Sequence, residues 1–242
     1  LVEGIRGIKD ACHGVPLKSD PKSATPVISG NVSLYNESKN GHVPPSAIIC
    51  CVGKIDDYNK AIKQDFKKAG HKIYLLGKRK NELGGSEFYR LFNELGANVP
   101  EINFEEARKE IYTMVDGVKV GLIESAHDIS EGGLAITISE MAFGAWGNNK
   151  IGATVDLKKV PDENLPTHTK LFSETGGFVC EISPKNEKKF LALCQKNKLT
   201  VYCIGSTTTK PNLTFKNGQT KIIDLPLAKS ADIWLNGLRK KL

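Results

Sequence analysis

Helix-type and strand-type segments alternate along most of this chain, and this alternation constrains the fold more than any other feature. From residue 57 to the carboxy terminus, apolar residues at helical spacing alternate with short apolar runs. Helices that alternate with strands bury their apolar faces as layers on a sheet. We therefore predict an α/β fold, in α+β layers, for residues 57–242.

Caps and turn residues set the expected element boundaries. Asn103 is a suitable helix N-cap, with Glu106 in the capping-box position. The pair Asn217 and Gly218 predicts a hairpin. The predicted helices cover residues 58–69, 86–95, 133–143, 186–196 and 228–239, with a further helix from Phe104. The predicted strands cover residues 71–76, 121–125, 151–156, 177–182 and 200–204.

Residues 1–56 contain too little apolar sequence to enclose a core of their own. We expect a helix over residues 1–14, a short strand over residues 26–29, and a strand buried on both faces over residues 46–53. The apolar surface of this region then needs another part of the protein, or a partner, to cover it. We place the domain boundary after residue 56, and we expect the chain to be a piece of a longer protein.

The composition excludes several classes of protein. The 242 residues carry a net charge of +7, which suits an anionic ligand, but the basic residues are spread along the chain without interleaved aromatics. We therefore expect no nucleic-acid partner. The longest apolar run is far too short to span a membrane, and the amino terminus does not have the pattern of a signal peptide. We expect a cytoplasmic protein that does not bind membranes.

The six cysteines show neither metal-ligand spacing nor the density of a disulfide framework. Several lie in apolar runs, where a free thiol behaves as a small buried hydrophobe. We predict that all six are reduced, buried and structural. They are Cys12, Cys50, Cys51, Cys180, Cys194 and Cys203.

Two glycine-bearing turns carry the residues best suited to chemistry. In the first turn, residues 29–37, Gly30 can bring backbone N–H groups to an anion, and Asn31 and Ser33 offer oxygen ligands to a cation such as Mg²⁺. Both features suit nucleotide binding. The alternative is an ordinary strand-end turn with local side-chain hydrogen bonds.

The second turn, residues 125–134, runs into a predicted helix, whose free N–H groups and dipole favour a phosphate. Asp128 can hold Mg²⁺, and Ser130 can donate to a phosphate oxygen. The alternative is that either side chain caps the helix. His127 suggests a general base, but a single histidine before such a turn is more often structural.

Residues 84–87 place two glycines before another helix, where helix capping explains the pattern as well as phosphate binding does. The chain has no nucleophile elbow, no HExxH pattern and no Walker A loop. These absences favour a phosphate-binding role built from backbone groups and magnesium ligands.

Four stretches, in the required order, resemble one family. These are GNVSLYNE at residues 30–37, ELGGSE at 82–87, HDISEGGL at 127–134 and LFSETGG at 171–177. They are similar to motifs of the small-type synthetase subunit of formylglycinamide ribonucleotide amidotransferase, also called phosphoribosylformylglycinamidine synthase. Four ordered matches are far more specific than one glycine-rich loop.

The resemblance implies an ATP-dependent carbon–nitrogen ligase of purine biosynthesis that uses glutamine-derived ammonia. The family consists of two homologous halves, each with an amino-terminal and a carboxy-terminal subdomain. The resemblance implies that this chain belongs to the second half. Residues 1–56 would be the end of its amino-terminal aminoimidazole-ribonucleotide-synthetase-like subdomain, and residues 57–242 its carboxy-terminal domain of the same type. Its cofactors would be ATP and Mg²⁺. Its partners would be the missing amino-terminal half of the synthetase, a glutamine amidotransferase subunit and a small accessory subunit.

By resemblance, Gly30 contacts ATP, Asn31 binds Mg²⁺ and Ser33 contacts the ribonucleotide substrate. Asp128 and Ser130 correspond to an auxiliary nucleotide and magnesium site. No catalytic residue falls in this chain, because the catalytic histidine and the ATP-contacting lysine of the family belong to the first half. We therefore expect the chain alone to be inactive.

One motif departs from the family pattern, since Thr175 stands where the first copy has a glutamine that binds substrate; we interpret this turn as vestigial. Two alternatives to the amidotransferase remain. One is another member of the same superfamily, such as aminoimidazole ribonucleotide synthetase, selenophosphate synthetase or thiamine-monophosphate kinase. The other is a non-catalytic module for nucleotide binding or dimerisation.

Overall fold

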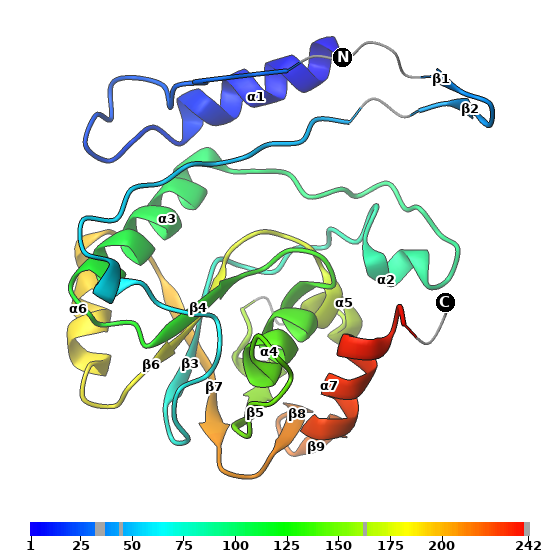
Figure 1. The fold of residues 1–242 in the computed structure, drawn as a ribbon. Coiled ribbons are helices and arrows are strands. Elements are labelled where there is room, and N and C mark those ends of the chain that lie inside the picture. Colours follow the sequence, from blue (N-terminus) through cyan, green and yellow to red (C-terminus); the bar gives the residue numbers. More distant parts are fainter. Residues whose placement is uncertain (32–36, 44–45, 162–163, 240–242) are drawn as a thin grey trace. The chain divides into compact units, whose positions relative to one another are not determined.

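The structure is a computed structural model that describes residues 1–31, 37–43, 46–161 and 164–239 (Figure 1). The chain divides into two compact units, an amino-terminal unit, Leu1–Tyr58, and a carboxy-terminal unit, Asn59–Leu242. Each unit is described by itself below.

The carboxy-terminal unit is built on a seven-stranded mixed sheet. Its strand order is β4-β6-β3-β7-β5-β8-β9, and every neighbouring pair is antiparallel except β5 with β8. The strands are β3 (Lys72–Leu76), β4 (Ser125–Asp128), β5 (Gly152–Asp156), β6 (Phe178–Ile182), β7 (Val201–Thr208), β8 (Asn212–Asn217) and β9 (Thr220–Pro226).

Helices cover both faces of this sheet (Figure 1). One hydrophobic cluster packs α4, α5 and α7 on one face, and a second packs α3 and α6 on the other. The helices are α2 (Glu87–Arg90), α3 (Phe104–Lys119), α4 (Gly133–Phe143), α5 (Thr167–Phe172), α6 (Glu187–Lys196) and α7 (Leu227–Asn236), with short 3-10 turns η1 (Tyr58–Lys60) and η2 (Leu157–Lys159).

Strand β3 shows how the sequence produces this three-layer arrangement. Ile73 and Leu75 point into the α4 cluster, whereas Tyr74 and Leu76 point into the α3 cluster. Successive side chains of a strand point to opposite faces, so a strand buried on both faces needs a continuous apolar run. The Tyr74 ring meets Phe190 of α6 edge-on, at 5.3 Å between centroids.

Several predicted boundaries are confirmed. Asn103 caps α3, because its side chain accepts hydrogen bonds from the amides of Glu105 and Glu106. The β8–β9 hairpin turns at Gly218, whose φ of 64° is accessible to glycine. Its amide donates to the Asp156 carboxylate, which fixes the turn to the end of β5.

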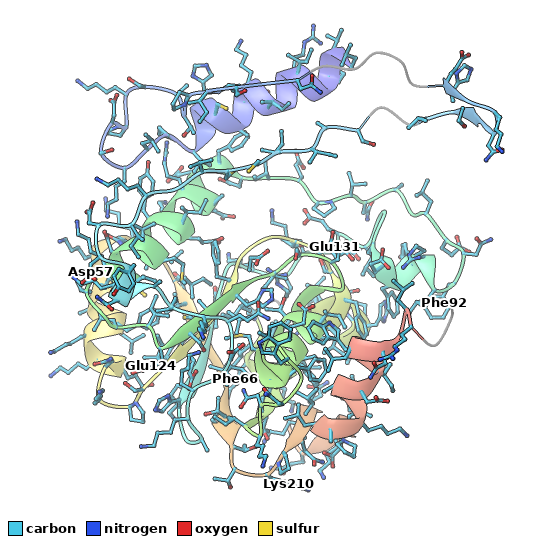
Figure 2. All side chains as sticks on the ribbon, in the orientation of Figure 1. Asp57, Phe66, Phe92, Glu124, Glu131 and Lys210 are labelled. Atoms are coloured by element: carbon cyan, nitrogen blue, oxygen red, sulfur yellow. The ribbon has the colours of Figure 1, made fainter. Side chains whose placement is uncertain are left out.

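The predicted helix over residues 58–69 is wrong beyond the single turn η1. The amides of Lys67 and Lys68 donate instead to the Glu181 carboxylate of β6, and the amide of Phe66 donates to the carbonyl of Met141. Phe66, labelled in Figure 2, is buried in the α4 cluster. Contacts distant in sequence therefore override the local helical pattern.

Two further boundaries differ from the prediction. Helix α2 is a single turn, because the chain reverses at Asn93, which has a positive φ of 57°. Strand β4 lies at Ser125–Asp128 instead of residues 121–125, because Leu122 donates its amide back to Gly117 and so continues the end of α3.

The amino-terminal unit consists of α1 (Val2–Gly14), the short pair β1 (Glu37–Ser38) and β2 (Gly41–His42), and extended chain. No residue of α1 is buried. The predicted strands over residues 26–29 and 46–53 are wrong, since neither segment has strand structure and both are exposed. A strand needs a neighbour to pair with, and the described residues of this unit supply none to either segment.

The cysteine prediction is partly wrong. All six thiols are free, and Cys180 and Cys194 are buried, but Cys50 and Cys51 are exposed in the run that forms no strand. Cys12 and Cys203 are half-buried. Among the described residues no helix is long and apolar enough to cross a membrane.

Candidate functional site

The first turn lies in the amino-terminal unit. Gly30 and Asn31 are exposed, and Ser33 lies outside the described residues. A Cβ added to Gly30 would meet no atom within 4 Å. The described contacts of this unit therefore do not explain the glycine, and the Asn31 amide is a hard oxygen donor that solvent reaches.

The second turn joins β4 to α4 in the carboxy-terminal unit. Asp128 and Ser130 are exposed on it, beside Glu131, which is labelled in Figure 2. Helix α4 has no side-chain cap hydrogen bond at its first turn, so neither Asp128 nor Ser130 caps it. The exposed Asp128 carboxylate can bind a cation, and the exposed Ser130 hydroxyl can donate to a phosphate oxygen.

The glycines of the second turn have a structural reason. Gly132 and Gly133 have φ values of 77° and 63°, which disfavour residues with a side chain. A Cβ on Gly133 would also lie 2.6 Å from the carbonyl oxygen of Ser173. The close approach that these residues allow is therefore made by the chain itself, between α4 and the loop after α5.

A carboxylate that sequence reasoning missed lies at this junction. The Oε1 atom of Glu174 accepts from the amide of Gly132 at 2.9 Å and from the amide of Glu87 at 2.8 Å. These amides begin α4 and α2, where a negative charge is favoured. The turn that we interpreted as vestigial in substrate binding therefore has a structural role, which no spacing in the sequence indicated.

Buried side chains bind the loop that carries Glu174, residues 173–177. The guanidinium of Arg79, which is 1% exposed, donates to the carbonyls of Ser173, Thr175 and Gly176. Burial lowers the pKa of Arg79 to about 10. Charge-assisted bonds to three carbonyls leave this loop little freedom.

Thr175 is part of the same support. Its hydroxyl donates to the Glu82 carboxylate at 2.7 Å and lies 2.8 Å from the hydroxyl of Ser173. The other Glu82 oxygen accepts from the amide of Glu101 at 3.2 Å. A threonine at this position therefore serves the fold.

His127 has a structural environment. Its Nδ1 lies 2.8 Å from the Asp128 carbonyl, and its Nε2 lies 3.2 Å from the Glu140 carboxylate of α4. The hydrogen bond with Glu140 raises the pKa of His127. Trp234 of α7 donates to the other Glu140 oxygen at 3.2 Å, so the histidine belongs to a chain of contacts joining three elements.

Helix capping accounts for the turn at residues 84–87. Ser86 caps α2 by accepting from the amide of Tyr89. The amides of Gly84 and Gly85 donate to the carbonyls of Asn98 and Leu95. These two N–H groups are therefore already used within the chain.

The structure thus places Asp128 and Ser130 together on one turn, and Gly30 and Asn31 together on another turn in the other unit. Among the described residues no group of three or more histidine, cysteine, aspartate or glutamate side chains gathers to hold a metal. A metal at either turn would need ligands from outside these groups, such as an amide, a phosphate or water.

The carboxy-terminal unit matches a known protein family. Residues 68–216 match the family described as "AIR synthase related protein, C-terminal domain", and the chain belongs to this family. The predicted α/β fold with an aminoimidazole-ribonucleotide-synthetase-like carboxy-terminal domain is therefore confirmed.

The particular relatives are named phosphoribosylformylglycinamidine synthase subunit PurL. The chain is 39% identical to that of Methanothrix thermoacetophila over 241 residues, which are 99% of this chain and 30% of the relative. It is 37% identical to that of Thermoplasma volcanium, over 98% of this chain and 29% of the relative. The predicted resemblance is confirmed, and the chain spans about 30% of the length of these relatives.

Solved structures agree on the fold. Thermotoga maritima PurL complexed with FGAR matches 72% of this chain and 30% of its own length, with a TM-score of 0.62 and 19% identity. The structure of PurLQS from the same organism matches 72% of this chain and 28% of its own length, with a TM-score of 0.57 and 21% identity. At these identities the similarity concerns the fold.

Proposed function

We propose that this chain is part of an ATP-dependent ligase that converts formylglycinamide ribonucleotide and ammonia to the amidine, with release of ADP and phosphate. The observation that carries the proposal is the 39% identity to a PurL subunit over nearly the whole chain. Solved PurL structures described as complexes with ATP and with FGAR support the same substrates.

In this proposal the first turn belongs to the ATP site. Gly30 contacts ATP, Asn31 holds Mg²⁺ and Ser33 contacts the ribonucleotide. The exposed Asn31 amide fits a magnesium ligand, since the ion prefers oxygen donors and retains several waters. Bound Mg²⁺ would neutralise phosphate charge, and the chain's own contribution is to position the reactants.

The amino-terminal unit is the region through which this chain would join the rest of the synthetase. We assign residues 1–56 to the end of a second amino-terminal subdomain and residues 57–242 to the carboxy-terminal domain. The large apolar residues that the unit leaves exposed support this assignment, because one continuous synthetase would cover them. They include Leu1, Val2, Ile5, Val27, Ile28, Ile48, Ile49 and Val52.

The partners follow from the same proposal. The structure of PurLQS from Thermotoga maritima supports an assembly of several subunits. We assign to this chain the missing synthetase half, a glutamine amidotransferase subunit that supplies ammonia, and a small accessory subunit.

A chimera tests the function directly. This chain replaces the matching 30% of the Methanothrix thermoacetophila subunit, and ammonia-dependent phosphate release is measured with formylglycinamide ribonucleotide and Mg-ATP. We expect turnover by the chimera and none by the chain alone. A chimera that folds cooperatively, binds the substrate and shows no turnover would refute the proposal, and so would turnover by the chain alone.

Asp128 and Ser130 form the proposed auxiliary nucleotide site. In the chain by itself this site should bind weakly, with a dissociation constant on the order of millimolar. Glu174 is one physical reason for this weak binding, because its carboxylate already accepts from the Gly132 amide, which a phosphate would otherwise use. Calorimetry of ADP binding to the chimera should show weaker binding for Asp128→Asn than for the parent. Identical ADP binding by the two proteins would show that Asp128 is not part of a nucleotide site.

A further inference from the structure

The segment that begins at α2, residues 87–103, is attached to the rest of its unit at few points. It contains only the single-turn helix α2, and residues 91–102 are all exposed. Phe92, labelled in Figure 2, is 62% exposed, and Leu91 and Leu95 are more exposed still. Segments with few buried contacts open locally at low free energy.

Three kinds of contact hold this segment. The ring of Phe88 stacks on Phe172 at 4.8 Å and on His168 at 5.7 Å, both on α5. The amides of Gly84 and Gly85, in the turn before α2, donate to the carbonyls of Asn98 and Leu95. Carboxylates hold the two ends of the segment. Glu174 accepts from the amide of Glu87 at the start, and Glu82 accepts from the amide of Glu101 at the end.

Glu174 differs from Glu82 because it also accepts from the amide of Gly132, in the turn before α4. One oxygen atom therefore joins two backbone amides that are 45 residues apart in sequence. Its own loop cannot follow a local movement easily, since Arg79 binds that loop through three carbonyls and is fully buried. Hydrogen bonds to a charged acceptor are among the stronger ones in proteins.

We propose that Glu174 is a latch that couples the turn before α4 to the exposed segment that begins at α2. While the carboxylate holds both amides, the segment stays against α5. An anion at the Gly132 amide, such as a phosphate oxygen, would repel the Glu174 carboxylate. Once the carboxylate leaves the Glu87 amide, the segment loosens while the sheet stays folded.

Hydrogen exchange on the whole chain tests the latch. Glu174→Ala should raise amide exchange by at least about tenfold both in residues 84–102 and at the start of α4, since charged hydrogen bonds are lost at both places. Exchange in β3 and β6 should not change. Glu174→Gln, which keeps one accepting oxygen, should give an intermediate increase. The matched control is Glu94→Gln, which removes an exposed charge from the same segment.

Three outcomes would overturn the proposal. Unchanged exchange in both regions would show that the carboxylate holds nothing. A rise in only one region would show a simple helix cap without coupling. A uniform rise that includes β3 and β6 would show that Glu174 stabilises the whole unit. None of these outcomes depends on nucleotide binding, so the latch and the proposed ligase function can fail separately.

Discussion

The two glycine-bearing turns both place glycine beside oxygen-bearing side chains, but they differ in how the surrounding structure explains them. In the carboxy-terminal unit, Gly133 lies against the carbonyl of Ser173, and the Gly132 amide binds Glu174. In the amino-terminal unit, Gly30 has open space around it and Asn31 is exposed. A motif that its own fold explains is weak evidence for a ligand, whereas a motif that its fold leaves unexplained is stronger evidence.

The two units also differ in how far they bury their apolar side chains. The carboxy-terminal unit buries two hydrophobic clusters, one on each face of its sheet. The amino-terminal unit exposes apolar residues such as Ile48, which is 96% exposed. Stability should therefore reside in the carboxy-terminal unit, and the proposed ligase activity should depend on the amino-terminal unit.

The largest expected contrast concerns apolar side chains. Phe190→Ala should lower the free energy of unfolding by about 3–5 kcal/mol, because the ring is fully buried against Tyr74. Ile48→Ala in the isolated chain should change it by less than about 0.5 kcal/mol. Urea denaturation followed by circular dichroism measures both. Comparable losses would mean that the amino-terminal unit has a core of its own.

A smaller contrast concerns carboxylates. Glu181 is fully buried and accepts from the amides of Lys67 and Lys68, from Ser125 and from His71. Glu181→Gln should lower the free energy of unfolding by about 1–3 kcal/mol, because one accepting oxygen is replaced by a donor group. Glu3→Gln, which removes an exposed partner of Arg6, should leave it unchanged. An unaffected Glu181→Gln variant would contradict this description of the network.

The smallest expected effect depends on pH. The bond to Glu140 raises the pKa of His127 in the folded state, so the protonated histidine stabilises the fold. This contribution is present below the ordinary pKa of histidine and is lost as the pH rises through the raised value. Glu140→Gln should remove it, which makes the difference in unfolding free energy from wild type larger at pH 5 than at pH 9. Glu37→Gln, beside the exposed His42, is the control and should show no such trend.

Sequence reasoning predicted the elements whose signals are local. The Asn103 cap, the turn at Gly218 and the apolar run of β3 each lie within a few residues and each predicted the observed element. The run at residues 46–53 has an equally clear pattern but forms no strand. A local pattern specifies which face is apolar, whereas strand pairing needs a neighbour that the pattern does not supply.

Contacts distant in sequence could not be predicted in this way. The amides that Glu174 binds lie 42 and 87 residues away in sequence, and those that Glu181 binds lie more than 100 residues away. No spacing rule joins them. The site residues Gly30, Asn31, Ser33, Asp128 and Ser130 came from the family resemblance together with the chemistry of their side chains, and their ligand-binding roles stay predictions.

The measurement that tests the central claim most directly is the turnover of the chimera with Asn31→Ala. If Asn31 holds Mg²⁺, turnover should fall by on the order of 100-fold, as when one electrostatic group is removed from a reacting centre, while the melting temperature stays unchanged. Asn40→Ala is the matched control, because Asn40 is an exposed asparagine of the same unit and should keep full activity. Normal turnover per folded molecule for Asn31→Ala, or equal losses in both variants, would contradict the account.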